Sequence, residues 1–330
     1  MHSSLQTATM DWKSDLVQSI RNIGALLQFV GLDSRSLWNE ENREFPTLVS
    51  RHYASLIHPK DPQDPLLRQV LATESETCIV PGFGADPVGD AEAQCSDGIL
   101  WKYAGRVLIL PTGSCAMHCR HCFRRAYPYR GIHSRGLQKR LQNFLENESS
   151  VAEVILSGGD PLLMDDAPLA DLLVMLAEIP HVRRLRIHTR LPVALPSRFS
   201  SDLFDALDLF PRTKVLVSQV NHAQELDLQS ARVFAELASH GFTLLNQSVL
   251  LQGVNDSVKA LAELSEKLAD QRVVPYYLHQ LDRAQGAAHF EVPVRRGRRI
   301  HEALTRCLPG YLVPRYVREK PGEPYKTRLA

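Results

Sequence analysis

From about residue 101 onward, the chain alternates short apolar runs with segments whose apolar residues recur at helical spacing. The runs that we expect to form strands are Val107–Leu110, Val151–Leu156, Arg184–Ile187, Lys214–Val217, Thr243–Leu251 and Val273–Leu278. The helices expected between or after them are Leu137–Glu146, Pro168–Glu178, Ser200–Leu209, Ala223–Ser239, Ser257–Asp270 and Arg296–Cys307. Repeated β–α units build a parallel sheet with right-handed crossovers. Six units are too few to close an eight-stranded barrel, so the pattern predicts an α/β fold, a partial open (β/α)6 barrel.

Polar residues follow most of these predicted strands. The first strand is followed by a cysteine-rich loop, and the later clusters are Ser157–Pro161, His188–Arg190, Ser218–His222 and His279–Asp282, with Asn246 and Gln247 inside the fifth strand. Barrel chemistry sits at the carboxyl ends of the strands. One or two such clusters would be ordinary loop polarity, whereas polar residues after most strands predict one shared site.

The loop after the first strand holds three of the six cysteines, Cys115, Cys119 and Cys122, spaced C-x3-C-x2-C. A cubane iron–sulfur cluster usually takes four cysteines, so three would leave one iron open for a substrate. Cations beside thiols favour the thiolate form that binds metal. The cationic flanks of this loop are Arg120, His121, Arg124 and Arg125.

Two other interpretations of this loop stay open. A structural zinc ion normally has four protein ligands, and His118 or His121 is the candidate for the fourth. A buried group of reduced cysteines is the second alternative, and three cysteines within eight residues argue against it. The spacing directly after an apolar strand is the signature of radical S-adenosylmethionine (SAM) enzymes.

We expect three parts along the chain. Residues 1–95 form an N-terminal helical region, with helical spacing over Trp12–Val30 and Leu48–Leu56. Residues 96–295 form the partial-barrel core, and residues 296–330 form a C-terminal helix and a tail. That tail is a Pro/Gly-rich loop, which ends at Lys326.

Charge and composition exclude several classes of partner and location. The formal net charge is +1, so composition gives no electrostatic case for nucleic acid or membrane binding. No apolar run approaches the length of a membrane span. Residues 1–13 lack the apolar core of a signal peptide. Few cysteines, three of them clustered, fit a reducing compartment, and we expect the cytoplasm.

The chain resembles the lysine 2,3-aminomutase family, and most closely the bacterial branch that makes β-lysine for elongation factor P. The resemblance runs from the N-terminal helices to about residue 328. Besides the cysteine loop, it is carried by residues 58–62, 103–108, 157–162, 188–192, 246–251, 253–256 and 275–282. It implies a partial barrel of the radical SAM type with a C-terminal tail that anchors pyridoxal phosphate (PLP).

The resemblance also implies which residues hold the cofactors. Cys115, Cys119 and Cys122 would ligate a [4Fe-4S] cluster whose open iron binds SAM. The methionyl amino group of SAM would lie at Ser157, Gly158, Gly159 and Asp160. Lys326 matches the lysine that holds PLP covalently, and the residues matching the surroundings of the PLP ring and phosphate are Tyr103 and Arg106.

For the substrate, the resemblance implies L-lysine. Arg124 matches the arginine that binds the substrate carboxylate, a task that suits its planar fork. Asp282 matches one of two acids that hold the ε-ammonium. The second acid is an aspartate in fermentative aminomutases and Glu319 here, which keeps the charge on a longer arm.

The implied activity is a radical isomerisation in which an amino group moves from Cα to Cβ of lysine. The implied partners are an electron donor of the flavodoxin or ferredoxin type, elongation factor P and its lysyl-transferring ligase. One alternative is a radical SAM aminomutase of another amino acid, for example glutamate or arginine, and the paired acids Asp282 and Glu319 discriminate because they suit a cationic side chain. Another alternative is a zinc or iron–sulfur binding protein without enzymatic activity.

Overall fold

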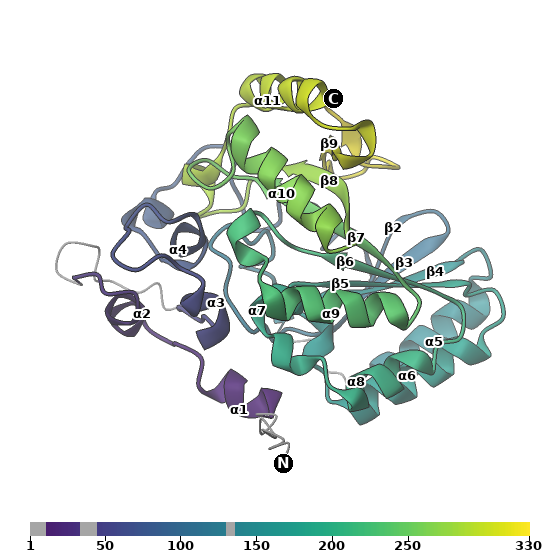
Figure 1. The fold of residues 1–330 in the computed structure, drawn as a ribbon. Coiled ribbons are helices and arrows are strands. Elements are labelled where there is room, and N and C mark those ends of the chain that lie inside the picture. The colour runs from purple at the N-terminus through teal and green to yellow at the C-terminus, as the bar shows by residue number, and fades with distance from the viewer. Residues whose placement is uncertain (1–10, 34–44, 130–135) are drawn as a thin grey trace, which may run out of the picture.

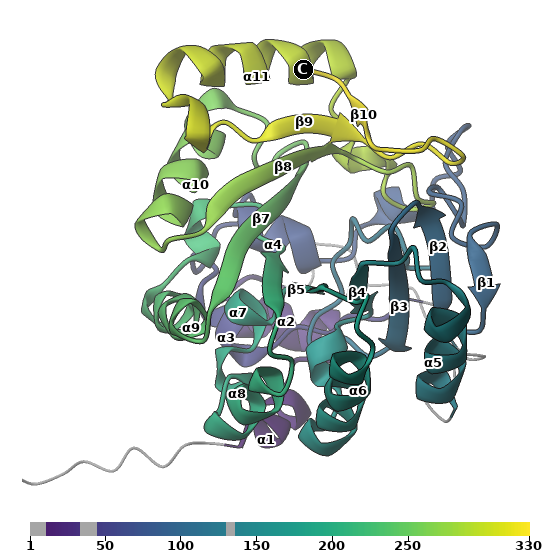
Figure 2. The same cartoon turned by 90° about the vertical axis from the view of Figure 1, so that its right-hand side faces the viewer.

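The computed structural model describes residues 11–33, 45–129 and 136–330. Most of the N-terminal stretch in which we expect no signal-peptide core lies outside these residues. Ten strands form one sheet in sequence order, from β1 (Gln94–Ser96) at one edge to β10 (Thr327–Arg328) at the other. The two edge strands do not pair with each other, so the sheet stays open and the predicted α/β partial barrel is confirmed (Figures 1 and 2).

All six predicted strands are present and pair in parallel with their sequence neighbours. They are β3 (Arg106–Thr112), β4 (Glu153–Gly158), β5 (Arg184–Thr189), β6 (Thr213–Ser218), β7 (Phe242–Leu250) and β8 (Val274–Gln280). Because all six run in the same direction, their carboxyl ends meet at one end of the sheet.

Four further strands extend the sheet beyond the predicted six. On one side, β2 (Ile99–Tyr103) pairs antiparallel with both β1 and β3. On the other side, β9 (Arg315–Arg318) pairs in parallel with β8, and β10 folds back antiparallel on β9. The predicted C-terminal tail is therefore the loop of a β9–β10 hairpin.

The helices cover the outside of the curved sheet (Figures 1 and 2). They are α5 (Leu137–Asn147), α6 (Asp166–Glu178), α8 (Ser201–Asp208), α9 (Leu228–Ser239), α10 (Val258–Asp270) and α11 (Val294–Cys307), with a short α7 (Leu191–Ala194) after β5. Side-chain oxygens of Ser200, Asp227 and Ser257 cap α8, α9 and α10. The cap at Asp227 explains why α9 starts later than predicted, because residues 223–225 form a separate 3-10 turn.

The helical stretch predicted over Trp12–Val30 is wrong in detail, because the chain forms two short helices there. They are α1 (Trp12–Val17) and α2 (Ile23–Phe29). Between them, Ile20 exchanges backbone hydrogen bonds with Val49, and the Asn22 side chain accepts from Ala25 N at 2.7 Å. This local pairing ends the first helix and caps the second. Further on, α3 (Arg51–Ser55) is shorter than predicted and α4 (Pro65–Val70) was not predicted.

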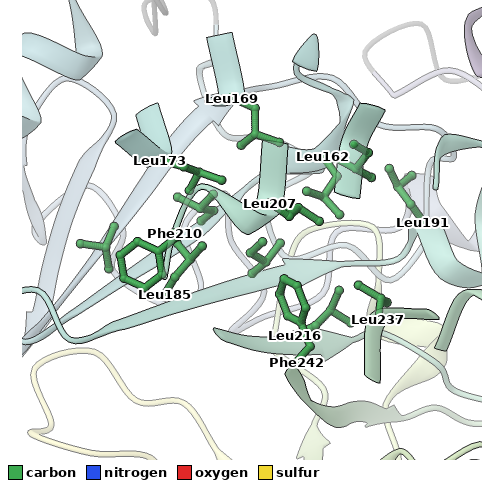
Figure 3. Close-up of a cluster of buried hydrophobic side chains, with 14 of the residues drawn as sticks. Leu162, Leu169, Leu173, Leu185, Leu191, Leu207, Phe210, Leu216, Leu237 and Phe242 are labelled. Atoms are coloured by element: carbon green, nitrogen blue, oxygen red, sulfur yellow. The ribbon is translucent and has the colours of Figure 1, made fainter. Parts of the chain in front are cut away.

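Successive side chains of the parallel strands point to opposite faces of the sheet, with a hydrophobic core on one face and a cavity on the other. Leu185 and Ile187 of β5 are fully buried in the main hydrophobic cluster, whereas Arg186 and His188 line a cavity on the other face of the sheet. Figure 3 shows part of the main cluster, in which leucines of strands and helices pack together. The same alternation places Ile155 and Ser157 of β4 in the cavity wall.

The N-terminal helices have their own hydrophobic cluster, and this cluster reaches the cysteine loop. Met117 of that loop and Ala194 of α7 are buried among residues of α2, α3 and α4. The N-terminal region therefore backs the loop from outside the sheet. Among the helices of the described ranges, none combines the length and apolar character that crossing a membrane requires.

Candidate active site

A cavity of ≈ 880 Å³ lies inside the partial barrel, and every site residue expected from the sequence lines it. Those residues are Tyr103, Arg106, Cys115, Cys119, Cys122, Arg124, Ser157, Gly158, Gly159, Asp160, Asp282, Glu319 and Lys326. They come from strands, from loops at the strand ends and from the C-terminal hairpin. Residues that are separated by more than 200 positions in the sequence therefore share one space.

The three cysteines of the loop between β3 and α5 are free thiols in this cavity. Burial raises the pKa of Cys115 well above its usual value and raises that of Cys122 to about 11. The neighbouring thiols Cys119 and Cys122 also raise the pKa of Cys115, and Cys119 raises that of Cys122. Desolvated thiols ionise when a metal supplies the compensating charge, so the donor set fits a metal cluster.

A zinc ion bound by this loop is not what the geometry favours. Within residues 11–33, 45–129 and 136–330, no three His, Cys, Asp or Glu side chains converge as a ligand set for one ion. His118 Nδ1 lies 2.7 Å from the Pro46 carbonyl, and His121 Nε2 lies 3.2 Å from the amide of Asn221. A cubane cluster spreads its thiolates over several irons, so it does not need the three sulfurs to meet at one point.

The glycines that end β4 let the cysteine loop approach very closely. Gly159 N donates to Thr112 O at 3.0 Å, and Asp160 N donates to Ser114 O at 2.7 Å. A Cβ atom on Gly159 would overlap Ser114 O and lie 2.7 Å from the Gly113 carbonyl carbon. Gly158 has φ +118°, a conformation that side chains disfavour, so both positions require glycine.

Asp160 joins the ends of β4 and β5. Its carboxylate accepts from Thr189 Oγ1 and Arg190 N, each at 2.8 Å, and from Leu162 N at 3.2 Å. Burial raises the pKa of Asp160 to about 6, and these hydrogen bonds counteract that rise. The side chain is thus largely occupied in holding two strand ends together.

Glu319 bridges two other residues of the predicted PLP site. Its carboxylate accepts from the Tyr103 hydroxyl through one oxygen and pairs with Lys326 Nζ through the other. Burial acts to raise the pKa of Glu319, but Lys326 and Tyr103 outweigh it and hold that pKa below its usual value. The Arg106 guanidinium lies over the Tyr103 ring, 4.4 Å from its centre. The contacts of Glu319 were not foreseen from the sequence.

Asp282 lies just after β8, and its carboxylate has no hydrogen-bond or ion-pair partner in the part of the chain that the structure describes. Burial raises the pKa of Asp282 to about 7; the charge of Lys326 lowers it and that of Glu319 raises it. A cation that enters the cavity would stabilise the ionised form of this acid.

Arg124 is oriented by two neighbours that the sequence analysis did not connect to it. Its Nε donates to Asp90 Oδ2 at 2.6 Å and its Nη1 to Ser157 Oγ at 3.1 Å. Asp90 is 1% exposed and also pairs with Lys102 at 2.6 Å. Arg124 Nη2 has no partner among residues 11–33, 45–129 and 136–330, and it remains for a ligand in the cavity.

Two cavity residues that contact predicted site residues were missed for different reasons. Asp90 lies outside every strand and motif, so no pattern in the sequence marks it. Arg190 stands in a polar cluster that the sequence analysis did single out, yet its contact with Cys119, at 2.8 Å from Nη1 to Sγ, depends on the folded loop.

Comparisons with known proteins give the chain its family. It is 41% identical to the L-lysine 2,3-aminomutase of Escherichia coli over 97% of this chain and 94% of that protein. It is 42% identical to that of Haemophilus influenzae over 87% of this chain and 85% of that protein. The enzyme of Clostridium subterminale is 36% identical over 96% of this chain and 77% of its own length. The chain belongs to the lysine 2,3-aminomutase family.

Other comparisons add little to this assignment. No family model matches the chain. Among solved structures, the radical SAM methyltransferase TsrM of Kitasatospora setae is 11% identical and covers 54% of this chain and 36% of its own, with a TM-score of 0.38. That likeness is too weak to carry an argument.

Family membership confirms the expected enzyme class, a radical SAM isomerase that acts on lysine. It also confirms the expected cofactor set, namely a [4Fe-4S] cluster, SAM and PLP. The described residues fit these groups. One cavity holds three thiols without disulfide partners, the side chain of Lys326, and the glycine cradle, by which we mean Gly158 and Gly159 at the end of β4.

We predict that Gly159→Ala disrupts the cluster site of this aminomutase, because a Cβ there meets the backbone of the cysteine loop. The variant should bind substantially less iron after anaerobic reconstitution and unfold at a lower temperature than the wild type. Gly310→Ala is the control, because nothing lies within 4 Å of a Cβ at that position. Equal iron content in Gly159→Ala and the wild type would show that the cradle does not matter.

Proposed function

We propose that this protein converts L-lysine into β-lysine by radical migration of the amino group from Cα to Cβ. The observation that carries the proposal is that one cavity contains the cysteine loop, Lys326 and an acid, Asp282, that has no partner among the described residues. When bound, the cluster with SAM would supply carbon-radical chemistry, and PLP would supply a conjugated system for the amino nitrogen. The protein's own work is to bind, orient and enclose these groups.

At one end of the cavity, Cys115, Cys119 and Cys122 would hold the cluster, with the fourth iron free for SAM. The glycine cradle brings the end of β4 against the start of this loop. The methionyl amino group of SAM would lie against Gly158 and Gly159. Asp160 would contribute mainly by fixing the strand ends, because Thr189 and backbone amides occupy its carboxylate.

At the other end, Lys326 would hold PLP covalently. Tyr103 and Arg106 would contact the PLP ring and phosphate, for which their stacked arrangement on β2 and β3 is suitable. Glu319 steadies the free amine of Lys326 by an ion pair. With Lys326 holding PLP, the carboxylate of Glu319 would be available to a second ammonium.

The substrate would lie between these ends. Arg124 Nη2 would bind the lysine carboxylate, since Asp90 and Ser157 hold the rest of the guanidinium. Asp282 and Glu319 would hold the ε-ammonium by charge-assisted hydrogen bonds. This pair of acids disfavours the alternative of a glutamate substrate, because the glutamate side chain carries the same negative charge as the two acids.

We further propose that the β-lysine goes to elongation factor P through its lysyl-transferring ligase, and that a flavodoxin or ferredoxin supplies the electron. The support is the resemblance of the strand-end segments to that branch of the family. Thiolate ligands require a reducing compartment, which supports a cytoplasmic location. An unchanged mass of elongation factor P in cells lacking this protein would contradict the link.

We predict that borohydride reduction of the PLP-loaded enzyme attaches PLP to Lys326. Lys326→Ala should lose the visible absorption of bound PLP but keep the iron content of the wild type, because the thiols belong to a different loop. Lys320→Ala, in the same hairpin loop, is the matched control and should keep both. An adduct that maps to another lysine would refute this assignment.

We predict that kcat/KM for lysine falls about tenfold per pH unit below about pH 7, because the pKa of Asp282 is raised to about 7 and only the carboxylate form holds the ε-ammonium. Asp282→Asn should lower kcat/KM by at least about thirtyfold, since losing one partner of a buried charge pair costs about 2–5 kcal/mol. It should also remove the fall below pH 7.

The variant Glu319→Asp distinguishes the role of Glu319 from that of Asp282. It keeps the charge but shortens the arm, so lysine turnover should drop while iron and PLP contents stay at wild-type levels. A wild-type pH profile that stays flat below pH 7 would contradict the role of Asp282. Unchanged lysine kinetics in Glu319→Asp and Glu319→Ala would leave Asp282 as the cation anchor.

A further inference from the structure

Arg190, the first residue after β5, connects the cysteine loop to a buried acid. It is 7% exposed and lines the cavity. Its Nη1 donates to Cys119 Sγ at 2.8 Å, and its Nη2 donates to Glu225 Oε2 at 2.8 Å. Nη2 also lies 2.7 Å from the side-chain oxygen of Gln69. The guanidinium thus presents one edge to a sulfur and another to a carboxylate.

The acid behind Arg190 is itself held firmly. Glu225 is fully buried, and its Oε1 accepts from the backbone amides of Asn221 and His222 at 2.9 and 3.0 Å. Gln69 Nε2 donates to the same oxygen at 3.2 Å. Because the carboxylate cannot turn away, the guanidinium is fixed in the orientation that points Nη1 at Cys119.

One nitrogen of Arg190 still lacks an acceptor. Nε is buried and has no hydrogen-bond partner among the described parts of the chain. Buried donors in folded proteins nearly always have an acceptor, so a leftover donor in a cavity wall marks a place for a bound group. The sulfides and thiolates of an iron–sulfur cluster are such acceptors.

We propose that Arg190 is a positioning residue that raises the reduction potential of the [4Fe-4S] cluster by donating a hydrogen bond to the Cys119 sulfur. The inference rests on the proposed function, because it requires the cluster at this loop. Reduction adds one electron from an external low-potential donor and places more negative charge on the sulfurs. A fixed cationic donor stabilises that charge more than it stabilises the oxidised cluster. Arg190 stays protonated throughout.

Neighbouring arginines do not share this arrangement, and one of them is a matched control. Arg125 also lines the cavity, but its Nη1 donates to the Arg120 carbonyl at 2.9 Å and its Nη2 to Glu76 at 2.5 Å. Arg125 thus carries the same charge near the same loop without a sulfur contact. Comparing the same substitution at the two positions separates the hydrogen bond from the general effect of charge.

The test is an anaerobic redox titration of the cluster-loaded enzyme, followed by electron paramagnetic resonance. The variants are Arg190→Gln, Arg190→Lys and Arg125→Gln, each with measured iron content. In Arg190→Gln, we expect the ratio of reduced to oxidised cluster at a fixed potential to fall at least tenfold, which is 59 mV for one electron. In Arg190→Lys, this ratio should fall less, because lysine keeps the positive charge but lacks the planar guanidinium. In Arg125→Gln, the ratio should change much less than in Arg190→Gln.

The outcomes distinguish this inference from the proposed function. A wild-type protein that assembles no [4Fe-4S] cluster would refute both. A full cluster with equal shifts in Arg190→Gln and Arg125→Gln, or with no shift at Arg190, would refute the role of Arg190 alone. If Arg190→Gln does not fold, Arg190→Lys decides, because a wild-type potential in that variant shows that the fork to Cys119 has no effect.

Discussion

The close backbone contact between the cysteine loop and the end of β4 is the constraint on which the rest of the site depends. Gly159 and Asp160 donate their amides to carbonyls of Thr112 and Ser114, at the point where β3 leads into the loop. Glycine at 158 and 159 is what permits this approach. Without it, the three thiols would stand away from the end of β4, where we propose that SAM binds. Asp160 then extends the same contact to β5 through Thr189.

Charge in the cavity is arranged so that most cations have a fixed acidic partner. Arg124 pairs with Asp90, Arg190 with Glu225 and Lys326 with Glu319. Among the acids of the cavity, Asp282 differs, because its carboxylate has neither a hydrogen-bond nor an ion-pair partner among the residues described. A partly buried carboxylate without a partner is costly, and a cationic substrate offsets that cost. The cavity is therefore complementary to an amino acid that ends in an ammonium group.

Much of this arrangement follows from local sequence pattern. The six central strands were predicted because each is a distinct apolar run, and their parallel pairing brings the strand-end residues into one cavity. The strands β9 and β10 were not predicted, because they are short and gain their stability from pairing with β8 and with each other. The bridge between Ile20 and Val49, which interrupts the N-terminal helix, is also a long-range contact. The contacts of Arg190 with Cys119 and of Glu319 with Tyr103 join residues far apart in sequence, so only the folded chain reveals them.

The central claim is that this cavity moves the α-amino nitrogen of lysine to the neighbouring carbon. The most direct measurement uses L-lysine labelled with 15N at the α-amino group, incubated anaerobically with the reconstituted enzyme, SAM, PLP and a reductant. Nuclear magnetic resonance of the product then locates the label. The account predicts β-lysine with 15N on the β-carbon, formed only when SAM and the reductant are both present. Unchanged lysine from a fully cluster- and PLP-loaded enzyme, or label that stays on the α-carbon, would contradict it.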